Sequence, residues 1–188
     1  MRISDETFKN IKFEAQMLSR DGYADCEFID CTFSDADLAD ISFMDCIFKV
    51  CDFGMSKLDN VGLKGVEFID CNLLGVDLSA SSPFLWKANF KNCQMDLILA
   101  VNMNLKGTQF EHCSLREADF TNANLAQASF DGCNLEKAIF EGTNLEKADF
   151  QGAINYTFDP SRNFLKKTKF SSNGITGLLS QYDIIINP

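Results

Sequence analysis

The sequence has little of the chemistry that catalysis or metal binding requires. Its one histidine, His112, lies beside Glu111 with no serine or cysteine nucleophile in reach, and no two cysteines share the C-x-x-C spacing of structural zinc sites. It contains neither a phosphate-binding glycine loop nor an apolar run long enough to cross a membrane. We therefore expect a cytoplasmic protein with no membrane contact, no enzymatic activity, no metal and no cofactor.

Positive charge is also scarce. The 188 residues include 27 acidic and 17 basic side chains, which gives a net charge of −10. The imbalance lies mainly in residues 1–80, where 16 acidic residues face 7 basic ones. A protein that binds nucleic acid neutralises phosphates with Lys and Arg. The charge thus disfavours direct binding to nucleic acid.

A five-residue period runs through most of the chain. Each unit has a large apolar residue at its centre, from Phe8 to Leu78 and again from Phe90 to Phe150, and 25 of these 28 central residues are Phe or Leu. The exceptions are Tyr23, Met95 and Ala100. A period of five matches neither the 3.6 residues of an amphipathic helix nor the 2.0 of a strand, so the chain must turn between units.

A twenty-residue period lies within the shorter one. Every fourth central residue is phenylalanine: Phe8, Phe28, Phe48, Phe68, Phe90, Phe110, Phe130 and Phe150. This pattern predicts that four units close one coil and that the central residues stack inside it. Small residues two positions before each centre should also point inward. Glycines two positions after a centre, such as Gly132 and Gly152, predict corners with positive φ.

The units resemble those of the pentapeptide-repeat family, which read roughly A-(D/N)-L-x-x. Ala118-Asp119-Phe120, Ala123-Asn124-Leu125 and Ala148-Asp149-Phe150 match this pattern closely. The resemblance implies an all-β fold, a right-handed quadrilateral β-helix of about seven coils with a short C-terminal helical cap. We expect the β-helix to occupy residues 1–158, with a two-residue insertion near residues 81–86, and the cap to occupy residues 159–188.

All eight cysteines occupy the small inward position. They are Cys26, Cys31, Cys46, Cys51, Cys71, Cys93, Cys113 and Cys133. Cysteines stacked on successive coils have parallel Cβ vectors too far apart for a relaxed disulfide, so we interpret them as buried thiols that act as small apolar side chains. The alternative is a zinc site formed by the first four, and the missing C-x-x-C spacing argues against it.

The repeat is imperfect at two places that could serve recognition, the insertion and an apolar group of outward residues. In the insertion, Leu85 is expected to be the inward central residue, while Phe84 and Trp86 cover the corner or project from it. Leu97, Leu99 and Val101 fall at outward positions and, together with Met55 and Leu74, predict an apolar patch. After Phe150 we expect the period to end, and residues 171–182 have the spacing of a short helix followed by a terminal strand at residues 183–186.

Outward carboxylates recur on the side of the expected coils that contains Leu38, Leu58 and Leu78. They are Asp37, Asp40, Asp59, Asp77, Asp119 and Glu141. Within the family, the chain resembles the quinolone-resistance subgroup without its large loops. Members of that subgroup bind DNA gyrase and topoisomerase IV and protect them, which implies that this acidic side imitates DNA and binds a type II topoisomerase.

A second function remains open. The apolar patch or the aromatic insertion could bind an unknown protein partner, which would make the chain an interaction scaffold. In the quinolone-resistance subgroup a C-terminal helix also joins two copies. The resemblance therefore implies a homodimer through the C-terminal segment, with Ile175, Leu178 and Leu179 as its contacts.

Overall fold

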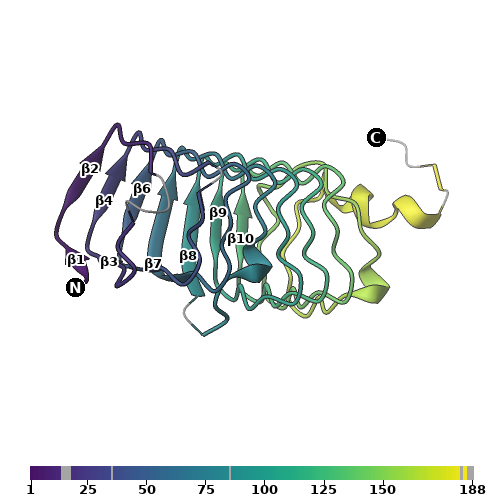
Figure 1. The fold of residues 1–188 in the computed structure, drawn as a ribbon. Helices are drawn as coiled ribbons and strands as arrows, with labels where there is room; N and C mark the ends of the chain where they lie inside the picture. The colour runs from purple at the N-terminus through teal and green to yellow at the C-terminus, as the bar shows by residue number, and fades with distance from the viewer. Residues whose placement is uncertain (14–17, 35, 85, 183, 186–188) are drawn as a thin grey trace.

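The chain winds into an elongated rod, and its two termini lie at opposite ends of that rod (Figure 1). This computed structural model describes residues 1–13, 18–34, 36–84, 86–182 and 184–185. The expected Leu85 and parts of the expected terminal strand, at 183 and 186, lie outside the described residues. Residues 184 and 185, which are described, have no regular structure.

Short parallel strands on adjacent coils pair with one another. The strands are β1 (Ile3–Ser4), β2 (Thr7–Lys9), β3 (Tyr23–Ala24), β4 (Glu27–Ile29), β5 (Ser42–Met44), β6 (Ile47–Lys49), β7 (Gly62–Ile69), β8 (Trp86–Lys91), β9 (Gln109–Glu111) and β10 (Ser129–Asp131). Isolated parallel bridges occupy the remaining sides, and in the later coils they recur every five residues at 114, 119, 124 and 129. Four sides per coil therefore form the quadrilateral β-helix that the period predicts.

We number the four sides by their central residues. Side 1 contains Phe33, side 2 contains Leu38, side 3 contains Phe43 and side 4 contains Phe48. Strands β1, β3 and β5 lie on side 3, and β2, β4, β6, β9 and β10 lie on side 4. The longer strands β7 and β8 continue around the corner between these two sides.

Stacked aromatic rings fill side 4 of the interior. From Phe8 to Phe150, rings on successive coils have centroids 4.7–5.4 Å apart, and Phe170 extends the column with a further separation of 5.5 Å. These separations match the spacing of paired strands, so each coil places its ring against the next. The repeated phenylalanine thus provides a contact between every pair of successive coils from Phe8 to Phe150.

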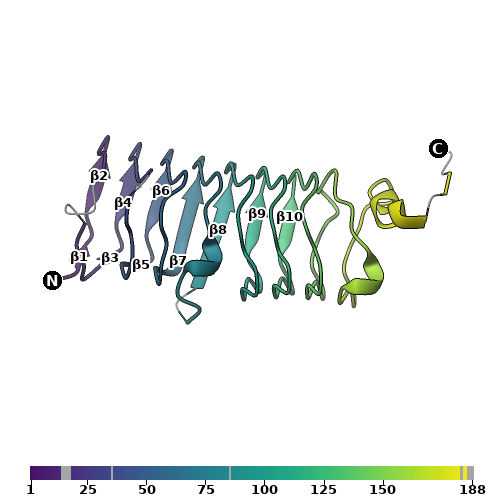
Figure 2. The same ribbon diagram turned by 45° about the vertical axis from the view of Figure 1, so that its right-hand side comes forward.

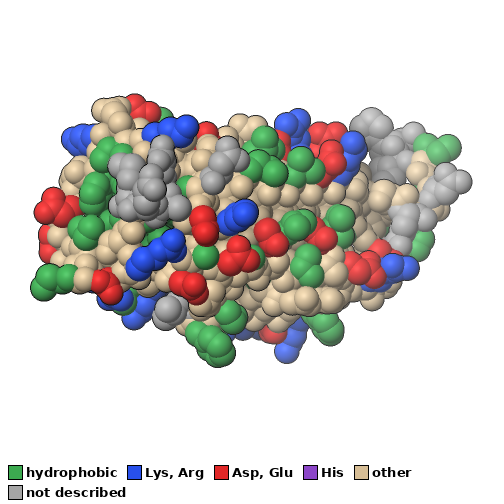
Figure 3. Space-filling model, viewed as in Figure 1, with side chains coloured by type: hydrophobic (Ala, Val, Ile, Leu, Met, Phe, Trp, Pro, Cys, Tyr) green, Lys and Arg blue, Asp and Glu red, His purple; other side chains and the backbone are tan. Residues whose placement is uncertain are grey.

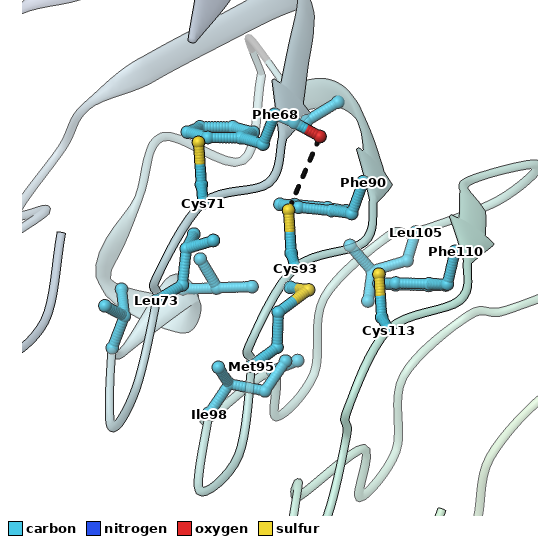
Figure 4. Packing of buried hydrophobic residues seen from close by; sticks show 14 of the residues in the cluster. Phe68, Cys71, Leu73, Phe90, Cys93, Met95, Ile98, Leu105, Phe110 and Cys113 are labelled. Carbon is cyan, nitrogen blue, oxygen red and sulfur yellow. Dashed lines mark hydrogen bonds between the residues drawn. The ribbon is translucent and has the colours of Figure 1, made fainter. Parts of the chain in front are cut away.

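The cysteine side chains lie inside the coils, as predicted. All eight are buried and free, and the thiol of Cys93 donates a hydrogen bond to the carbonyl of Phe68 on the preceding coil, 3.4 Å away (Figure 4). Cys71 and Cys113 stack on either side of Cys93, next to the phenylalanine column. A thiol in this position fills space and also satisfies a backbone carbonyl.

The corners have a fixed backbone conformation. The residue two positions after a central residue has positive φ in almost every coil, and we call this the corner position. Asp or Asn often occupies it, and glycine does so at Gly65, Gly75, Gly107, Gly132 and Gly142. Gly152 is an exception to the prediction because its φ is not positive. Asn155 has positive φ on the same coil.

The insertion changes the register of side 3. A 3₁₀ helix, η2 (Leu78–Ala80), is capped by the Asp77 carboxylate and leads into a loop that projects from the rod beside β8 (Figure 2). Trp86 pairs with Leu63 and packs against the core, so Trp86 takes the central position that was expected of Leu85. The register then shifts at the corner after Lys64, which returns Phe90 to alignment with Phe68.

The repeat extends further than the sequence suggested. Parallel bridges join residue 144 to Phe164 and residue 149 to Lys169, so the period does not end at Phe150. The 3₁₀ helix η3 (Pro160–Arg162) lies within this last coil. The expected helix over 171–182 is instead two 3₁₀ helices, η4 (Ile175–Leu178) and η5 (Ser180–Tyr182). The division into a solenoid and a separate cap domain stays a prediction.

In the described part of the chain, no helix has the length and apolar character needed to span a bilayer.

Candidate functional site

The acidic side predicted from the sequence is side 2, and its outward ladder is mixed. Bridges on this side join residues in the order Asp37 to Lys57, Asp77 to Leu99, Leu99 to Asp119 and Asp119 to Ile139. Figure 3 shows a line of acidic side chains along the rod, with basic and hydrophobic side chains between them. The structure therefore places three of the six predicted carboxylates, Asp37, Asp77 and Asp119, at every second coil of this ladder.

Three of these carboxylates also stabilise the local backbone. Asp37, Asp77 and Asp119 each accept a hydrogen bond from the amide two residues ahead, at 3.0, 2.9 and 2.9 Å. Asn124 and Asn144 accept the same bond on side 3, at 3.2 and 3.0 Å. An amide side chain can therefore replace the carboxylate in this turn without loss of the bond.

The other three predicted carboxylates differ in how much charge they present. Asp59 is exposed, and Asp40 accepts a hydrogen bond of 2.8 Å from the Asn60 side chain at the next corner. Glu141 forms an ion pair with Arg162, with 3.0 Å between Oε1 and Nη1. The pair offsets the charge of Glu141, so the acidic surface is strongest on the N-terminal coils.

The apolar patch adjoins the acidic ladder. Leu97 and Leu99 are 50% and 44% exposed, whereas Val101 is half-buried. Leu99 stands in the acidic ladder itself, while Leu97 occupies the corner between sides 1 and 2. Met55 and Leu74, on earlier coils, are also exposed. The two surfaces that the sequence treated as alternatives are therefore parts of one continuous face.

An ion pair that sequence reasoning missed supports this patch. The carboxylate of Asp96 is nearly buried and accepts hydrogen bonds from Nε and Nη2 of Arg116, at 2.9 and 2.6 Å, and from Ser114, at 2.5 Å. Burial raises the pKa of Asp96, but these hydrogen bonds outweigh burial and lower it below its ordinary value. The sequence contains one indication of this pair. Asp96 and Arg116 have opposite charges and are twenty residues apart, so they occupy equivalent positions on adjacent coils.

The groove beside this ion pair is polar as well as apolar. Leu74, Leu97, Arg116 and Lys137 line it, and its volume is about 460 Å³. Asp96 fixes the guanidinium of Arg116, whose side chain is 50% exposed, next to the exposed Leu97. A fixed arginine beside an apolar side chain is typical of residues that contribute most to protein interfaces.

The aromatic insertion separates into an inward and an outward residue. Trp86 is half-buried against the core, whereas Phe84 is 92% exposed. Only Phe84 is therefore available to a partner as a projecting aromatic side chain.

The cysteine thiols have little access to solvent. Burial raises the pKa of Cys46 to about 11, and the hydrogen bond with Cys113, together with burial, raises the pKa of Cys93 to about 12. His112 is exposed at a corner with φ of 52°. Among the described residues, no group of three or more His, Cys, Asp or Glu side chains is placed to hold a metal ion.

The three residues expected at a dimer contact lie in different environments. Ile175 is 48% exposed, Leu179 is half-buried, and Leu178 is 7% exposed and packs against the hydrophobic core. Leu178 thus contributes to the end of the solenoid, which leaves Ile175 as the most accessible of the three.

Comparison with known proteins identifies the family. A family model for pentapeptide repeats matches residues 26–65, 104–142 and 118–154, in eight copies. The chain belongs to the pentapeptide-repeat family. No curated protein matches it significantly in sequence.

Solved structures share the fold. A trypsin-treated variant of QnrB1, a plasmid-mediated fluoroquinolone resistance protein, aligns with 98% of this chain over 99% of its own length, with a TM-score of 0.67 and 17% identity. HetL, a pentapeptide repeat protein involved in heterocyst differentiation regulation from the cyanobacterium Nostoc sp. strain PCC 7120, aligns with 90% of this chain over 86% of its own, with a TM-score of 0.54 and 15% identity. At these identities the likeness concerns the fold alone.

Proposed function

We propose that side 2 binds the basic DNA-binding channel of a type II topoisomerase, DNA gyrase or topoisomerase IV, in the cytoplasm. The protein acts there as a non-enzymatic DNA mimic, and binding protects or modulates the topoisomerase, with quinolone resistance as one consequence. Carboxylates on a rod satisfy such a channel through charge and shape, without any base contact.

One observation carries this proposal. Asp37, Asp59 and Asp77 place a carboxylate on side 2 of three successive coils, about 4.8 Å apart along the rod, a spacing that follows from strand pairing. None of the ion pairs among the described residues involves these three side chains. Their charge is therefore available to a basic partner. The likeness of the fold to QnrB1, a fluoroquinolone resistance protein, also supports the proposal.

The test measures gyrase supercoiling with and without ciprofloxacin over a range of protein concentrations. In the variant D37N/D59N/D77N the amides keep the turn bonds at positions 37 and 77, so the fold persists while three charges are lost. We expect about tenfold weaker binding to gyrase, and weaker binding of the parent as salt rises.

The matched control E67Q/E136Q/E146Q removes the same charge from sides 4, 1 and 3, one carboxylate from each. We expect this control to bind gyrase as the parent does. Equal loss in both variants would show an effect of net charge alone, and unaltered binding of D37N/D59N/D77N would refute the proposal.

A second candidate function is a scaffold that binds another protein through the apolar patch. It is favoured by the exposure of Leu97 and Leu99 next to the fixed Arg116. The variant L97D/L99D should abolish a salt-resistant contact, because it charges the centre of the patch. Asp tolerates the positive φ of 62° at position 97, so the variant should fold. An unaffected contact would exclude this surface.

The proposed homodimer through the C-terminal segment is tested separately. Replacement of the exposed Ile175 by Asp should shift the protein from dimer to monomer in analytical ultracentrifugation. A parent protein that is already monomeric at all concentrations would remove the dimer from the proposal.

A further inference from the structure

Side 3 carries a row of lysines that neither the acidic side nor the apolar patch explains. Lys64 and Lys87 are register partners on adjacent strands, and Lys106 follows the central Leu105 on the next coil. All three are exposed. No ion pair among the described residues includes any of them, whereas Lys49 and Lys91 on side 4 pair with glutamates at 2.5 and 2.7 Å.

Such a row is unfavourable in the free protein. Like charges directly opposite one another on paired strands repel, and here three lysine side chains project from backbone positions about 4.8 Å apart. An anionic group bound across the row would relieve the repulsion between all three lysines at once. A single isolated lysine would not create this preference.

An exposed aromatic side chain lies close to the row. Phe84 is 92% exposed on the loop that projects beside β8 (Figure 2). Only two residues lie between it and Lys87 in the sequence, so their Cα atoms are at most about 11 Å apart. The insertion, which is the main break in the repeat, therefore places an apolar contact beside positive charge.

We propose that this surface, Lys64, Lys87, Lys106 and Phe84, binds an acidic α-helix of a protein partner. Carboxylates placed once per turn of an α-helix are about 5.4 Å apart along its axis, whereas the lysines are about 4.8 Å apart along the rod. Across three lysines the two spacings differ in total by only about 1 Å. Alternate residues of an extended strand advance about 6.7 Å, which accumulates a mismatch of about 4 Å over the same row. An apolar side chain of the partner covers Phe84.

The small number of lysines disfavours more highly charged anions. Polybasic segments that hold proteins at anionic membranes usually have about four to eight Lys or Arg residues, and this row has three. Double-stranded DNA presents one negative charge per roughly 1.7 Å of its axis, more than three lysines can neutralise. This surface is distinct from side 2 and does not depend on binding to a topoisomerase.

The test uses labelled peptides of about 20 residues and fluorescence anisotropy. One peptide has glutamates at every third or fourth position in a single stripe, with leucine at one end; the other has the same composition with the glutamates scattered around the helix. We expect the striped peptide to bind more tightly at low salt. The variant K64Q/K87Q/K106Q should bind it about tenfold more weakly. Phe84→Ala should also weaken it, with an unchanged salt dependence.

The control K137Q/K147Q/K169Q removes the same charge from lysines that already have acidic partners at 3.8, 3.9 and 3.0 Å. It should bind the striped peptide as the parent does. The proposal is overturned if neither peptide binds, if both bind equally, or if the two triple variants behave alike. Tighter binding to phosphatidylserine vesicles or to a single-stranded oligonucleotide than to the striped peptide would assign the surface to another ligand and refute the acidic helix.

Discussion

Val50 is in a backbone conformation that suits it poorly, and its replacement by Asn should stabilise the protein. It has φ of 54°, and its amide donates to the carbonyl of Ile69 on the next coil at 2.9 Å. Asp30 and Asp70 occupy the same corner on the adjacent coils, with φ of 51° and 54° and equivalent amide bonds of 2.9 Å. The ladder therefore imposes this conformation whatever the side chain.

The expected gain is the difference between two terms. The left-handed backbone conformation costs an L-residue about 1–2 kcal/mol, and this cost is higher for a β-branched residue such as Val than for Asn. Val50 is 56% exposed, so Asn forfeits less than half of the value of a buried valine, about 1 kcal/mol at most. We expect Val50→Asn to stabilise the fold by about 0.5–1 kcal/mol, which raises Tm by about 1–4 °C for a chain of this length.

Thermal unfolding followed by circular dichroism measures the effect. Asn leaves the net charge unchanged, so electrostatic repulsion does not contribute. The reciprocal variant Asp30→Val puts a β-branched residue at the same corner one coil earlier and should lower Tm by a few degrees. A lower Tm for Val50→Asn, together with no effect of Asp30→Val, would refute the reasoning that corner strain limits stability here.

Two further predictions concern buried groups. All eight cysteines are buried, and the pKa of Cys93 is raised to about 12. A thiol reagent at pH 8 should therefore modify none of them in the folded protein and all of them in denaturant. Rapid modification of the native protein would contradict the inward placement. Asp96 has a pKa below its ordinary 3.8, so it contributes stability above that pH and loses it as the pH falls through the lowered pKa. Asp96→Asn should cost about 1–2 kcal/mol at pH 7 and progressively less below about pH 3.8 by thermal unfolding, whereas a pH-independent difference would show that the charge of Asp96 is unimportant.

Much of the fold follows from local periodicity. The five-residue period is enough to place Phe110 and Cys113 inside the coil. Each coil buries its large and small residues against the equivalent residues of the next coil. The acidic side was predictable for the same reason, since Asp37 and Asp77 are forty residues apart. The same period also aligns Leu99 with Asp77 and Asp119. Sequence reasoning nevertheless treats the acidic side and the apolar patch as separate surfaces, because it assigns each outward residue by its own chemistry.

The amino-acid sequence alone determined the coil, its stacked aromatic interior and the uneven distribution of charge, because these depend on contacts that repeat between identical units. The tertiary structure decided where the repeat fails. Trp86 takes the central position opposite Leu63 and packs against the core, since the corner after Lys64 absorbs one residue and shifts the register. The fixed Arg116 and the unpaired row at Lys64 and Lys87 also depend on which side chains meet across coils, and that is a property of packing in three dimensions.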